Sequence, residues 1–394
     1  MTKSQAFDWG KSRQLKNAAV GVSTLRVAHL TPKYFSPESV VGGGERYVSS
    51  LAQALEAAQA SNSLPYRFAQ TIFTLGPEPK LIVQDRIPVR ILQNDNPSDN
   101  PMDGMSKLLW KELIDYDLIH IHQSLTLFGA YCCVIAKTLR KPLIMTDLGA
   151  GANPVMLNGK GLQLADGVIS ISNFARSFID PYFTGPHEVI IGPVDTDFFS
   201  VPARTRRNQR TAICVSRILP HKGIDRIIRA LPSALKLRVV GRVYDTAYHK
   251  TLTQMSVGKD IEFIHDADDQ KLLSLYQSSD LFIQGSTFKD CKGNVITKTE
   301  LMGLTTLEAL ACGLPVIVSD GGALPELVLD PTWGRVFSTD DQLEAYLNDF
   351  RHGWWPQRPS HHEARSHVLN NYSYKPVGVR LGNFYASVYD AWSY

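Results

Sequence analysis

The strongest constraint on the fold is an alternation of short apolar segments with helix-like segments that runs along the chain twice. The first run extends from residues 25–30 to residues 167–172, and the second from residues 212–216 to residues 280–283. Between the runs the pattern stops near Val201, in a segment rich in arginine. Strands that alternate with helices form parallel sheets covered by helices on both faces. The sequence therefore predicts an α/β fold of two Rossmann-like, doubly wound domains that face one another across a cleft.

Length and composition agree with two globular domains. A chain of 394 residues is too long for one ordinary hydrophobic core. With 44% apolar and 20% charged residues it is not disordered, and its net charge of +3 is too small to predict a nucleic-acid-binding surface. No apolar stretch is long enough for a membrane span, and the five cysteines lack metal-type spacing. These features predict a cytoplasmic protein with reduced thiols.

Residues 1–23 form a polar, basic segment at the amino terminus. Its charges in the first twenty positions are Lys3, Asp8, Lys11, Arg13 and Lys16. Termini of this kind are poorly ordered unless another part of the chain holds them. The alternative interpretation is weak attraction to an anionic membrane surface. The expected location is therefore the cytoplasm, with the inner face of the membrane as a place of weak contact.

A short helical segment between two glutamates carries the clearest sign of a ligand site. Glu300 and Gly303 come first, and Glu308 lies inside a helix that Gly313 and Pro315 end. The free amides at the start of this helix belong to Leu304, Thr305 and Thr306. A helix N-terminus favours a phosphate, and carboxylates favour hydroxyl groups, because an ionised carboxylate only accepts hydrogen bonds. The segment therefore predicts a site for a nucleotide sugar.

Two cations precede this segment in the second predicted domain. Arg217 and Lys222 lie in the turn between the strand at residues 212–216 and the helix at residues 224–230. Such a pair can converge on a diphosphate, the arginine as a planar fork and the lysine as a point charge. Because these cations and Glu300 follow strands of one sheet, we expect the three side chains at the same edge of that sheet.

These motifs resemble those of the retaining glycosyltransferases of family 4, which have the two-domain fold called GT-B. In the second half, the matching positions are Arg217, Lys222, Gly223, Glu300, Gly303, Glu308, Gly313, Pro315, Gly321, Gly322 and Glu326. In the first half, Gly43-Gly44-Glu45 is similar to the family's glycine-rich loop. The segment from Asp117 to His122 is similar to its Asp-x-x-His-x-His strand.

The resemblance implies a division of the chain into three parts. Residues 1–200 would form the acceptor-side domain, and residues 201–375 the domain that binds the nucleotide sugar donor. Residues 376–394 would form a last helix that returns to the first domain.

The resemblance also implies a role for each matching residue. Arg217 and Lys222 would neutralise the donor's diphosphate, Glu308 would hold the ribose hydroxyls, and Glu300 would hold hydroxyls of the transferred sugar. The amides that would contact sugar and phosphate belong to Gly303, Leu304, Thr305 and Thr306. Gly43 and Gly44 would let the backbone approach the diphosphate or the acceptor closely. No metal ion is expected, because the cations replace it, and Asp195-Thr-Asp197 is interpreted as a turn.

The chain departs from the family pattern at the end of one strand. Where the family has Thr-x-His-Gly, this chain has Thr146, Asp147, Leu148 and Gly149, so leucine takes the place of the histidine. Asp147 is the nearest polar residue. It either substitutes for the histidine as a catalytic residue or caps the glycine-containing loop that follows.

Two further departures add positive charge. Arg242 follows Gly241 where the family often has Gly-x-Gly, so we expect another donor-binding cation near the phosphates. Residues 287–299 form an insert that contains Lys289, Lys292 and Lys298. This insert is either a solvent-exposed loop, as most loops are, or a contact for the donor sugar or a charged acceptor.

His120 and His122 share one face of a predicted strand, because side chains alternate with a period of two. Two histidines could begin a metal site, but no third ligand is evident in the sequence. Closed metal sites need more ligands. We therefore expect these histidines to pack in the core or the cleft.

The sequence thus predicts a retaining glycosyltransferase that works without a metal by a front-face mechanism. Its donor would be a nucleotide diphosphate sugar, with UDP or GDP as the expected nucleotide, and its acceptor a hydroxyl group of a glycan, a lipid-linked glycan or a small natural product. Two alternatives stay open: an epimerase or hydrolase of nucleotide sugars, and a non-catalytic partner subunit that binds sugar nucleotides. A dinucleotide dehydrogenase is disfavoured, because neither half contains Gly-x-Gly-x-x-Gly.

Overall fold

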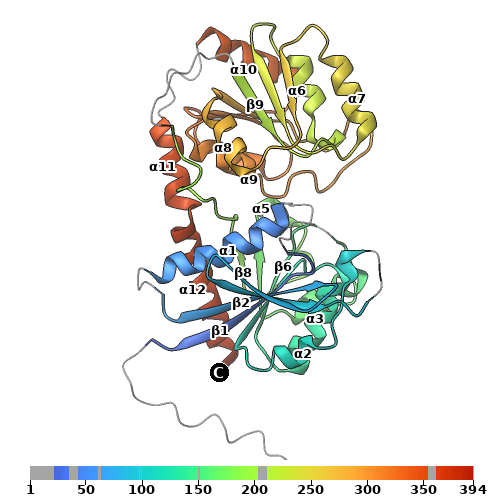
Figure 1. Cartoon of the computed structure of the whole chain (residues 1–394), viewed down its shortest axis with the longest axis vertical. Coiled ribbons are helices and arrows are strands. Elements are labelled where there is room, and N and C mark those ends of the chain that lie inside the picture. Colours follow the sequence, from blue (N-terminus) through green and yellow to red (C-terminus); the bar gives the residue numbers. More distant parts are fainter. Residues whose placement is uncertain are drawn as a thin grey trace, which may run out of the picture.

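The structure is a computed structural model that describes residues 22–34, 43–60, 64–96, 98, 100–149, 151–202, 211–353 and 361–393. The expectations for the basic amino-terminal segment up to residue 21 and for the arginine-rich segment at 203–210 lie outside these ranges. The described chain forms two α/β domains, one above the other, each built around one sheet (Figure 1).

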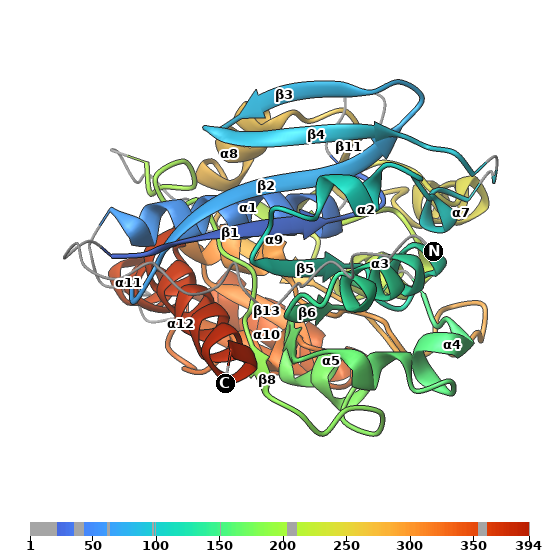
Figure 2. The ribbon, with the colours of Figure 1, turned by 90° about the horizontal axis from the view of Figure 1, so that it is seen from below.

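The first domain contains an eight-stranded sheet in the order β3-β4-β2-β1-β5-β6-β7-β8. Figure 2 shows this order from β3 at the top to β8 at the bottom. The strands are β1 (Thr24–Leu30), β2 (Arg67–Gly76), β3 (Lys80–Gln84), β4 (Ile87–Gln93), β5 (Leu118–His122), β6 (Leu143–Thr146), β7 (Gly167–Ser170) and β8 (His187–Val189). The helices around it are α1 (Gly43–Gln59), α2 (Leu109–Glu112), α3 (Leu127–Thr138), α4 (Pro154–Leu157) and α5 (Asn173–Ser177), with the short 3-10 turns η1 (Pro101–Asp103) and η2 (Gly161–Leu164).

One edge of this sheet differs from the predicted parallel arrangement. β3 runs antiparallel to β4, and the two strands are joined by Asp85 and Arg86, which both have positive φ. A two-residue turn with positive φ at both positions reverses the chain at once, so no crossover helix is needed. The other strand pairs of the sheet are parallel, as the alternation predicted.

The second domain contains a parallel six-stranded sheet in the order β11-β10-β9-β12-β13-β14. Its strands are β9 (Thr211–Val215), β10 (Lys236–Val240), β11 (Ile261–Ile264), β12 (Leu281–Gln284), β13 (Val316–Ser319) and β14 (Gly334–Phe337). Its helices are α6 (Ile224–Ala230), α7 (Thr246–Met255), α8 (Asp269–Gln277), α9 (Leu304–Ala311) and α10 (Asp340–His352), with η3 (Pro220–Lys222) and η4 (Leu324–Leu327). Counted within the domain, the strand order is 3-2-1-4-5-6, the Rossmann order.

The central strands explain the apolar runs seen in the sequence. Every residue of β5, β6, β7, β12 and β13 is buried. Strands of a parallel sheet are covered by helices on both faces, so they are apolar along their whole length rather than at alternate positions. The polar exceptions in these strands, such as His120, His122 and Gln284, are therefore the residues that need an explanation.

The last two helices connect the domains. α11 (His361–Asn371) packs against α9 of the second domain, and α12 (Tyr374–Ser393) packs along α1 of the first. A Cβ atom at Gly378 of α12 would lie 1.8 Å from the carbonyl O of Ala54 in α1, so the two helices can approach this closely only because the residue is glycine. No helix within the described ranges has the length and apolar character needed to cross a membrane.

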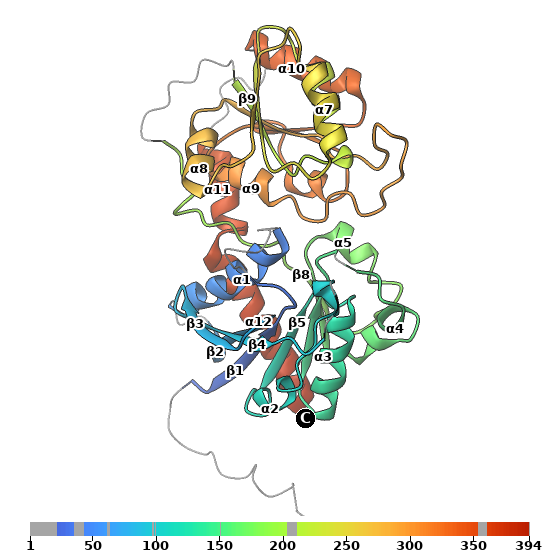
Figure 3. The ribbon, with the colours of Figure 1, turned by 45° about the vertical axis from the view of Figure 1, so that its right-hand side comes forward.

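Further contacts between the domains lie on either side of their interface, where α1 and α5 lie below the second domain (Figure 3). On one side Arg46 of α1 makes two hydrogen bonds, of 2.6 and 3.2 Å, to the carboxylate of Asp269 at the start of α8. On the other side the carboxylate of Glu326 accepts hydrogen bonds from the amides of Asn173 and Phe174 in α5. These contacts fix how the carboxyl ends of the two sheets face each other.

Candidate functional site

A cleft of about 450 Å³ lies between the domains. Its lining residues are Gly44, Gln123, Leu148, Gly149 and Ile171 of the first domain and Val215, Ser216, Arg217, Lys222, Gln284 and residues 298–305 of the second. We call this space the central cleft. Gly44 and Gln123 follow β1 and β5, and Arg217 and Gln284 lie after β9 and at the end of β12. In each sheet these are the two strands between which the order reverses, the place where open α/β sheets bind ligands.

Lys222 and Glu300 form an ion pair in the central cleft. Lys222 Nζ lies 2.9 Å from Glu300 Oε2 and 3.3 Å from the carbonyl O of Thr299. Burial alone would raise the pKa of the Glu300 carboxyl, but Lys222 and the amides of Gly303 and Met302 hold this pKa below its usual range. Glu300 is therefore ionised at neutral pH. Lys222 uses two of its three ammonium hydrogens on these neighbours, which leaves one for a ligand.

Gln284 connects this ion pair to helix α9. Its Nε2 donates to Glu300 Oε2 at 2.7 Å, and its Oε1 accepts a hydrogen bond from the hydroxyl of Thr306 at 2.7 Å. Both ends of the Gln284 amide are thus used, which fixes the Glu300 carboxylate relative to the helix. Gln284 is not among the residues that were predicted from the sequence. It could have been predicted, because it is the polar residue that ends the otherwise apolar strand β12.

Helix α9 begins at the central cleft, as the sequence predicted. Gly303 precedes its first residue with a φ of +81°, and no side chain of the described residues caps the helix. A Cβ atom at this position would lie 2.8 Å from Leu327 Cδ1, so both the space and the backbone favour glycine. Leu304 and Thr305, the first two residues of α9, line the cleft. The positive end of the helix therefore faces the space next to Lys222.

A second pocket, of about 640 Å³, adjoins the central cleft and shares Arg217, Leu304 and Thr305 with it. We call it the adjoining pocket. Arg217 and Arg242 are both exposed and line it, and the Arg217 guanidinium lies 5.7 Å from the ring centre of Tyr244. Arg217 therefore lies at the junction of the two spaces, and Arg242 lines the adjoining pocket.

Glu308 lies at the far side of the adjoining pocket. It is 9% exposed, and the hydroxyl of Tyr276 donates to its Oε2 at 2.9 Å. Burial raises the pKa of the Glu308 carboxyl to about 7, although Arg46 and Tyr276 act to lower it. Glu300, before α9, and Glu308, inside it, thus have opposite pKa shifts. The difference arises because Glu300 has a buried cation beside it, whereas Arg46 is already paired with Asp269.

The first domain's wall of the central cleft carries no charged side chain among its described lining residues. Gly44 lines it, and a Cβ atom at Gly44 would lie 3.3 Å from Gln123 Nε2. Gly43 is the first residue of α1. Leu148 lines the cleft at the position of the family's histidine.

Asp147 lies next to this wall but not in the described lining of the cleft. Its Oδ2 is 3.4 Å from Nζ of Lys298, which comes from the insert at residues 287–299 and does line the cleft. Burial raises the pKa of Asp147, against the influence of Lys298 and of the Gly149 and Leu148 amides. The insert is thus not only a solvent-exposed loop. Lys289 and Lys292 are exposed, and Lys292 pairs with Asp245 at 2.5 Å.

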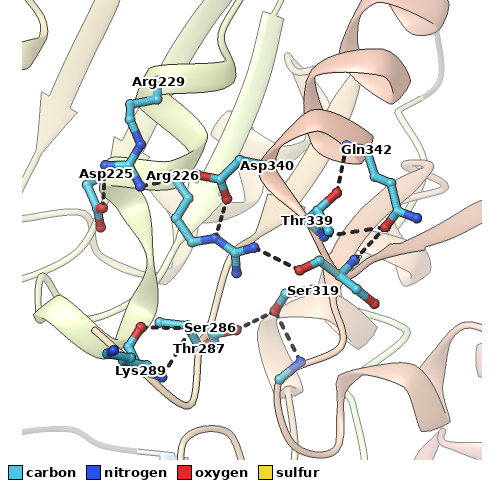
Figure 4. Close-up of polar contacts among 12 residues, drawn as sticks. Asp225, Arg226, Arg229, Ser286, Thr287, Lys289, Ser319, Thr339, Asp340 and Gln342 are labelled. Carbon is cyan, nitrogen blue, oxygen red and sulfur yellow. Dashed lines mark hydrogen bonds and ion pairs between the residues drawn. The ribbon is translucent and has the colours of Figure 1, made fainter. Parts of the chain in front are cut away.

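A polar network behind the cleft holds the elements that carry these residues (Figure 4). Arg226 of α6 donates to Asp340 at the start of α10 at 2.7 Å, and Arg229 donates to the same carboxylate at 3.3 Å. The hydroxyl of Ser319, at the end of β13, donates to the carbonyl O of Ser286 at 2.5 Å. The network therefore positions the beginning of α6, directly after Lys222, and the segment after β12.

The two strand histidines have a third histidine beside them, which the sequence analysis did not find. His29 of β1 lies against His120 and His122 of β5, and the three side chains are fully buried. The expectation that no third candidate ligand exists was therefore wrong. His29 was missed because it is a single histidine in β1 and meets the pair only through the pairing of β1 with β5. The expectation of core packing agrees with their hydrogen bonds to Gln70, Tyr385 and Thr146.

The predicted turn at residues 195–197 is present. Asp195 Oδ1 accepts hydrogen bonds from the amides of Asp197 and Phe198, at 3.1 and 2.9 Å. Its carboxylate is thus used within the backbone turn, as aspartate often is.

Comparison with known proteins gives a family match for the second domain. Residues 195–365, which contain the Lys222–Glu300 pair and Glu308, match the family described as glycosyl transferases group 1. Among the curated relatives of this chain is the GDP-mannose-dependent alpha-(1-6)-phosphatidylinositol monomannoside mannosyltransferase of Mycolicibacterium smegmatis. It is 31% identical over 245 residues, which cover 55% of this chain and 61% of that protein. The chain thus spans less than two thirds of this relative.

Solved structures share the fold across nearly the whole chain. The sucrose-phosphate synthase of Thermosynechococcus elongatus aligns with a TM-score of 0.70 and 18% identity over 93% of this chain and all of that one. HepE of Anabaena, in complex with UDP, aligns with a TM-score of 0.68 and 17% identity over 92% of this chain and all of that one. At these identities the likeness concerns the fold alone. The fold is that of the GT-B glycosyltransferases, as the sequence predicted.

Proposed function

We propose that this protein is a retaining glycosyltransferase that moves a sugar from a nucleotide diphosphate sugar to a hydroxyl acceptor without a metal ion. The observation that carries the proposal is the Lys222–Glu300 ion pair beside the uncapped start of α9, at the switch point of the second sheet. A cation and a helix N-terminus favour a diphosphate, and an ionised carboxylate favours sugar hydroxyls. The diphosphate and the sugar are the two groups of a sugar nucleotide that are joined by the bond that the reaction breaks.

The proposed mechanism follows from where charge develops. When the bond between the sugar and the diphosphate breaks, negative charge grows on the leaving oxygen. Lys222 and Arg217 line the central cleft and would stabilise that charge together with the first amides of α9. Glu300 would hold the sugar, and the acceptor hydroxyl would attack from the same face as the leaving group. No residue is required as a covalent nucleophile, and the acceptor would enter from the first domain's wall.

The adjoining pocket provides space for the nucleoside. Glu308 would accept hydrogen bonds from the ribose hydroxyls. Arg217, which lines both spaces, and Arg242, which lines this pocket, would add positive charge for the phosphates. The descriptions of two similar proteins name two different nucleotides. The Mycolicibacterium smegmatis relative is described as GDP-mannose-dependent, and the HepE structure contains UDP. UDP and GDP sugars are therefore the first donors to test.

A second candidate function is supported by Leu148. A non-catalytic subunit that binds a sugar nucleotide would need the second domain's site but not a polar group at this position of the first domain. Leu148 lines the central cleft, and Asp147 beside it is outside the described lining. Donor binding without turnover would distinguish this candidate from the enzyme.

The first prediction concerns donor binding and turnover. In a thermal-shift panel of UDP-, GDP-, ADP- and dTDP-sugars, we expect a UDP- or GDP-sugar to raise the melting temperature, because a ligand that binds only the folded state stabilises it. The matching donor should then give a product with a retained anomeric configuration in nuclear magnetic resonance spectra. Free sugar formed equally fast without any acceptor would favour a hydrolase. No stabilisation by any of these donors would contradict the proposal.

The second prediction concerns the pH dependence of donor affinity. Burial raises the pKa of Glu308 to about 7, and the ionised carboxylate, which only accepts hydrogen bonds, is the form that suits two ribose hydroxyls as donors. We expect the affinity for the sugar nucleotide to fall about tenfold from pH 8 to pH 6, because the ionised fraction falls from about nine tenths to about one tenth over this range. Isothermal titration calorimetry between pH 8 and pH 5.5 measures this. Glu308→Gln should bind more weakly at pH 8 and lose the dependence; an equal slope in both proteins would refute the assignment.

A further inference from the structure

Lys298 is the cation of the insert at residues 287–299 that reaches the central cleft. Its Nζ lies 3.4 Å from Asp147 Oδ2 and 3.4 Å from the carbonyl O of Gly151, both in the first domain. It also lies 5.6 Å from the ring centre of Phe178 in α5. A lysine of the second domain therefore lies against the first domain's wall of the central cleft. The described residues of the first domain that line this wall are uncharged.

The backbone that carries Lys298 is held in place. The hydroxyl of Thr299 donates to the carbonyl O of Thr287 at 2.8 Å, which closes the insert at its base. The carbonyl O of Thr299 accepts from Lys222, so the residue after Lys298 is bound to the ion pair of the cleft. Lys298 is thus two positions from Glu300 and is fixed to the same structure as Lys222 and Glu300.

The contacts of the Lys298 ammonium itself are long. At 3.4 Å, both are close to the limit of a hydrogen bond, whereas Lys222 lies 2.9 Å from its carboxylate and Lys292 lies 2.5 Å from that of Asp245. Two long contacts leave one ammonium hydrogen for a third partner. One oxygen of the Asp147 carboxylate is also free to accept, because Oδ1 is buried without a hydrogen bond among the described residues. A ligand oxygen can therefore join this pair without breaking a strong contact.

We propose that Lys298 donates a hydrogen bond to a hydroxyl of the transferred sugar, at the side of the central cleft opposite Lys222. The inference rests on the proposed function, and it adds a sugar-contacting residue from the insert. The sugar would then be held between Glu300, which accepts hydrogen bonds, and Lys298, which donates them. Lys298 would thus contact the sugar from the second domain while it also reaches Asp147 and Gly151 of the first.

The test separates the sugar from the nucleotide. Affinities for UDP and UDP-glucose, or for GDP and GDP-mannose if the wild-type protein prefers them, are measured by calorimetry for the wild type and for Lys298→Met. We expect the affinity for the nucleoside diphosphate to stay within about twofold, and the affinity for the sugar nucleotide to fall about 10- to 100-fold, the usual effect of a hydrogen bond to a charged group. Lys298→Arg should recover part of the loss, and the melting temperature of each variant confirms folding.

Lys292→Met is the matched control, because Lys292 belongs to the same insert and pairs with Asp245 away from the described lining of the central cleft. It should bind both ligands as the wild type does. An equal loss for nucleotide and sugar nucleotide in Lys298→Met, or no loss for either, would overturn the inference. Unchanged sugar-nucleotide affinity with slower transfer would also overturn it, because Lys298 would then serve the acceptor. If the wild type binds none of the four ligands, the proposed function fails as well.

Discussion

Lys222→Ala is expected to lose at least about 100-fold in turnover while the protein stays folded. In the proposed reaction Lys222 faces the leaving diphosphate, and removing one well-placed donor of this kind costs about 3 kcal/mol of transition-state stabilisation in other enzymes. Its ammonium lies 2.9 Å from the Glu300 carboxylate, and its side chain is only 8% exposed, so little water screens its charge. Initial rates with the donor identified in the thermal-shift panel measure the effect.

The fold should survive this substitution because Glu300 keeps other partners. Gln284 donates to the same carboxylate oxygen at 2.7 Å, and the amides of Gly303 and Met302 also act on it. Lys236→Ala is a suitable control, because Lys236 pairs with Glu262 on the edge of the second sheet and is partly exposed. Circular dichroism and melting curves should match for the two variants. Turnover near that of the wild type in Lys222→Ala would refute the assignment of the phosphate site.

The sequence predicted the second domain's half of the site better than the first domain's half. Arg217, Lys222, Glu300 and Glu308 all follow or flank strands of one parallel sheet. Their meeting at its carboxyl edge follows from the alternation of strands and helices alone. The sequence also identified Gly303 at the start of this helix, and its positive φ in the structure explains why glycine is favoured there.

The residues that the sequence did not reveal depend on contacts between distant parts of the chain. Arg46 and Asp269 are 223 positions apart and meet only because the two domains face each other. Tyr276 appears in the sequence as one apolar position of α8, and only the packing of α8 near α9 places its hydroxyl against Glu308. No local pattern records such contacts. The polar residue Gln284 at the end of an apolar strand is the exception, and it could have been found.

Asp147 is a case in which the sequence did not reveal the direction of a side chain. The sequence identified it as the polar residue nearest to the missing histidine, which made a catalytic role a reasonable prediction. The structure instead shows Leu148 and Lys298 in the lining of the central cleft, and Asp147 beside Lys298. A side chain's distance along the chain from a motif does not fix its direction, because neighbouring residues at a strand end point to opposite faces. The role of Asp147 therefore stays a prediction.

The buried histidines allow their protonation states to be assigned from the hydrogen bonds around them. Gln70 donates through Nε2 to the carbonyl O of Ala52 and to Glu56, so its Oε1 is the atom that faces His29. His29 Nε2, 3.0 Å from this oxygen, therefore carries a hydrogen. Since neutral imidazole has one donor, His29 Nδ1 is the acceptor of its 3.1 Å contact with Nε2 of His122. Burial lowers the pKa of both rings, so the neutral forms are expected at neutral pH, and they satisfy both contacts.

Protonation of this cluster is expected to cost the protein much of its stability in acid. Burial lowers the pKa of His29 from 6.5 to about 4, with the Gln70 hydrogen bond as the largest opposing influence, and the pKa values of His120 and His122 are also lowered. Above pH 6.5 the ring is neutral in both the folded and the unfolded chain. As the pH falls from 6.5 towards 4, the unfolded chain takes up a proton that the folded chain refuses, so the free energy of unfolding decreases. For His29 alone this amounts to about 3 kcal/mol.

Urea unfolding of the wild type and of His29→Gln between pH 7 and pH 4 measures this contribution. The free energy of unfolding of the wild type should fall relative to that of His29→Gln by about 3 kcal/mol over this range. Burial raises the pKa of Glu308 to about 7 and stabilises the folded chain as the pH falls, but this opposite influence is present in both proteins and cancels. His352→Gln, at an exposed position, should leave the wild-type dependence unchanged. Parallel pH profiles for the wild type and His29→Gln would show that the ring accepts a proton inside the fold, and the neutral hydrogen-bond network would then be wrong.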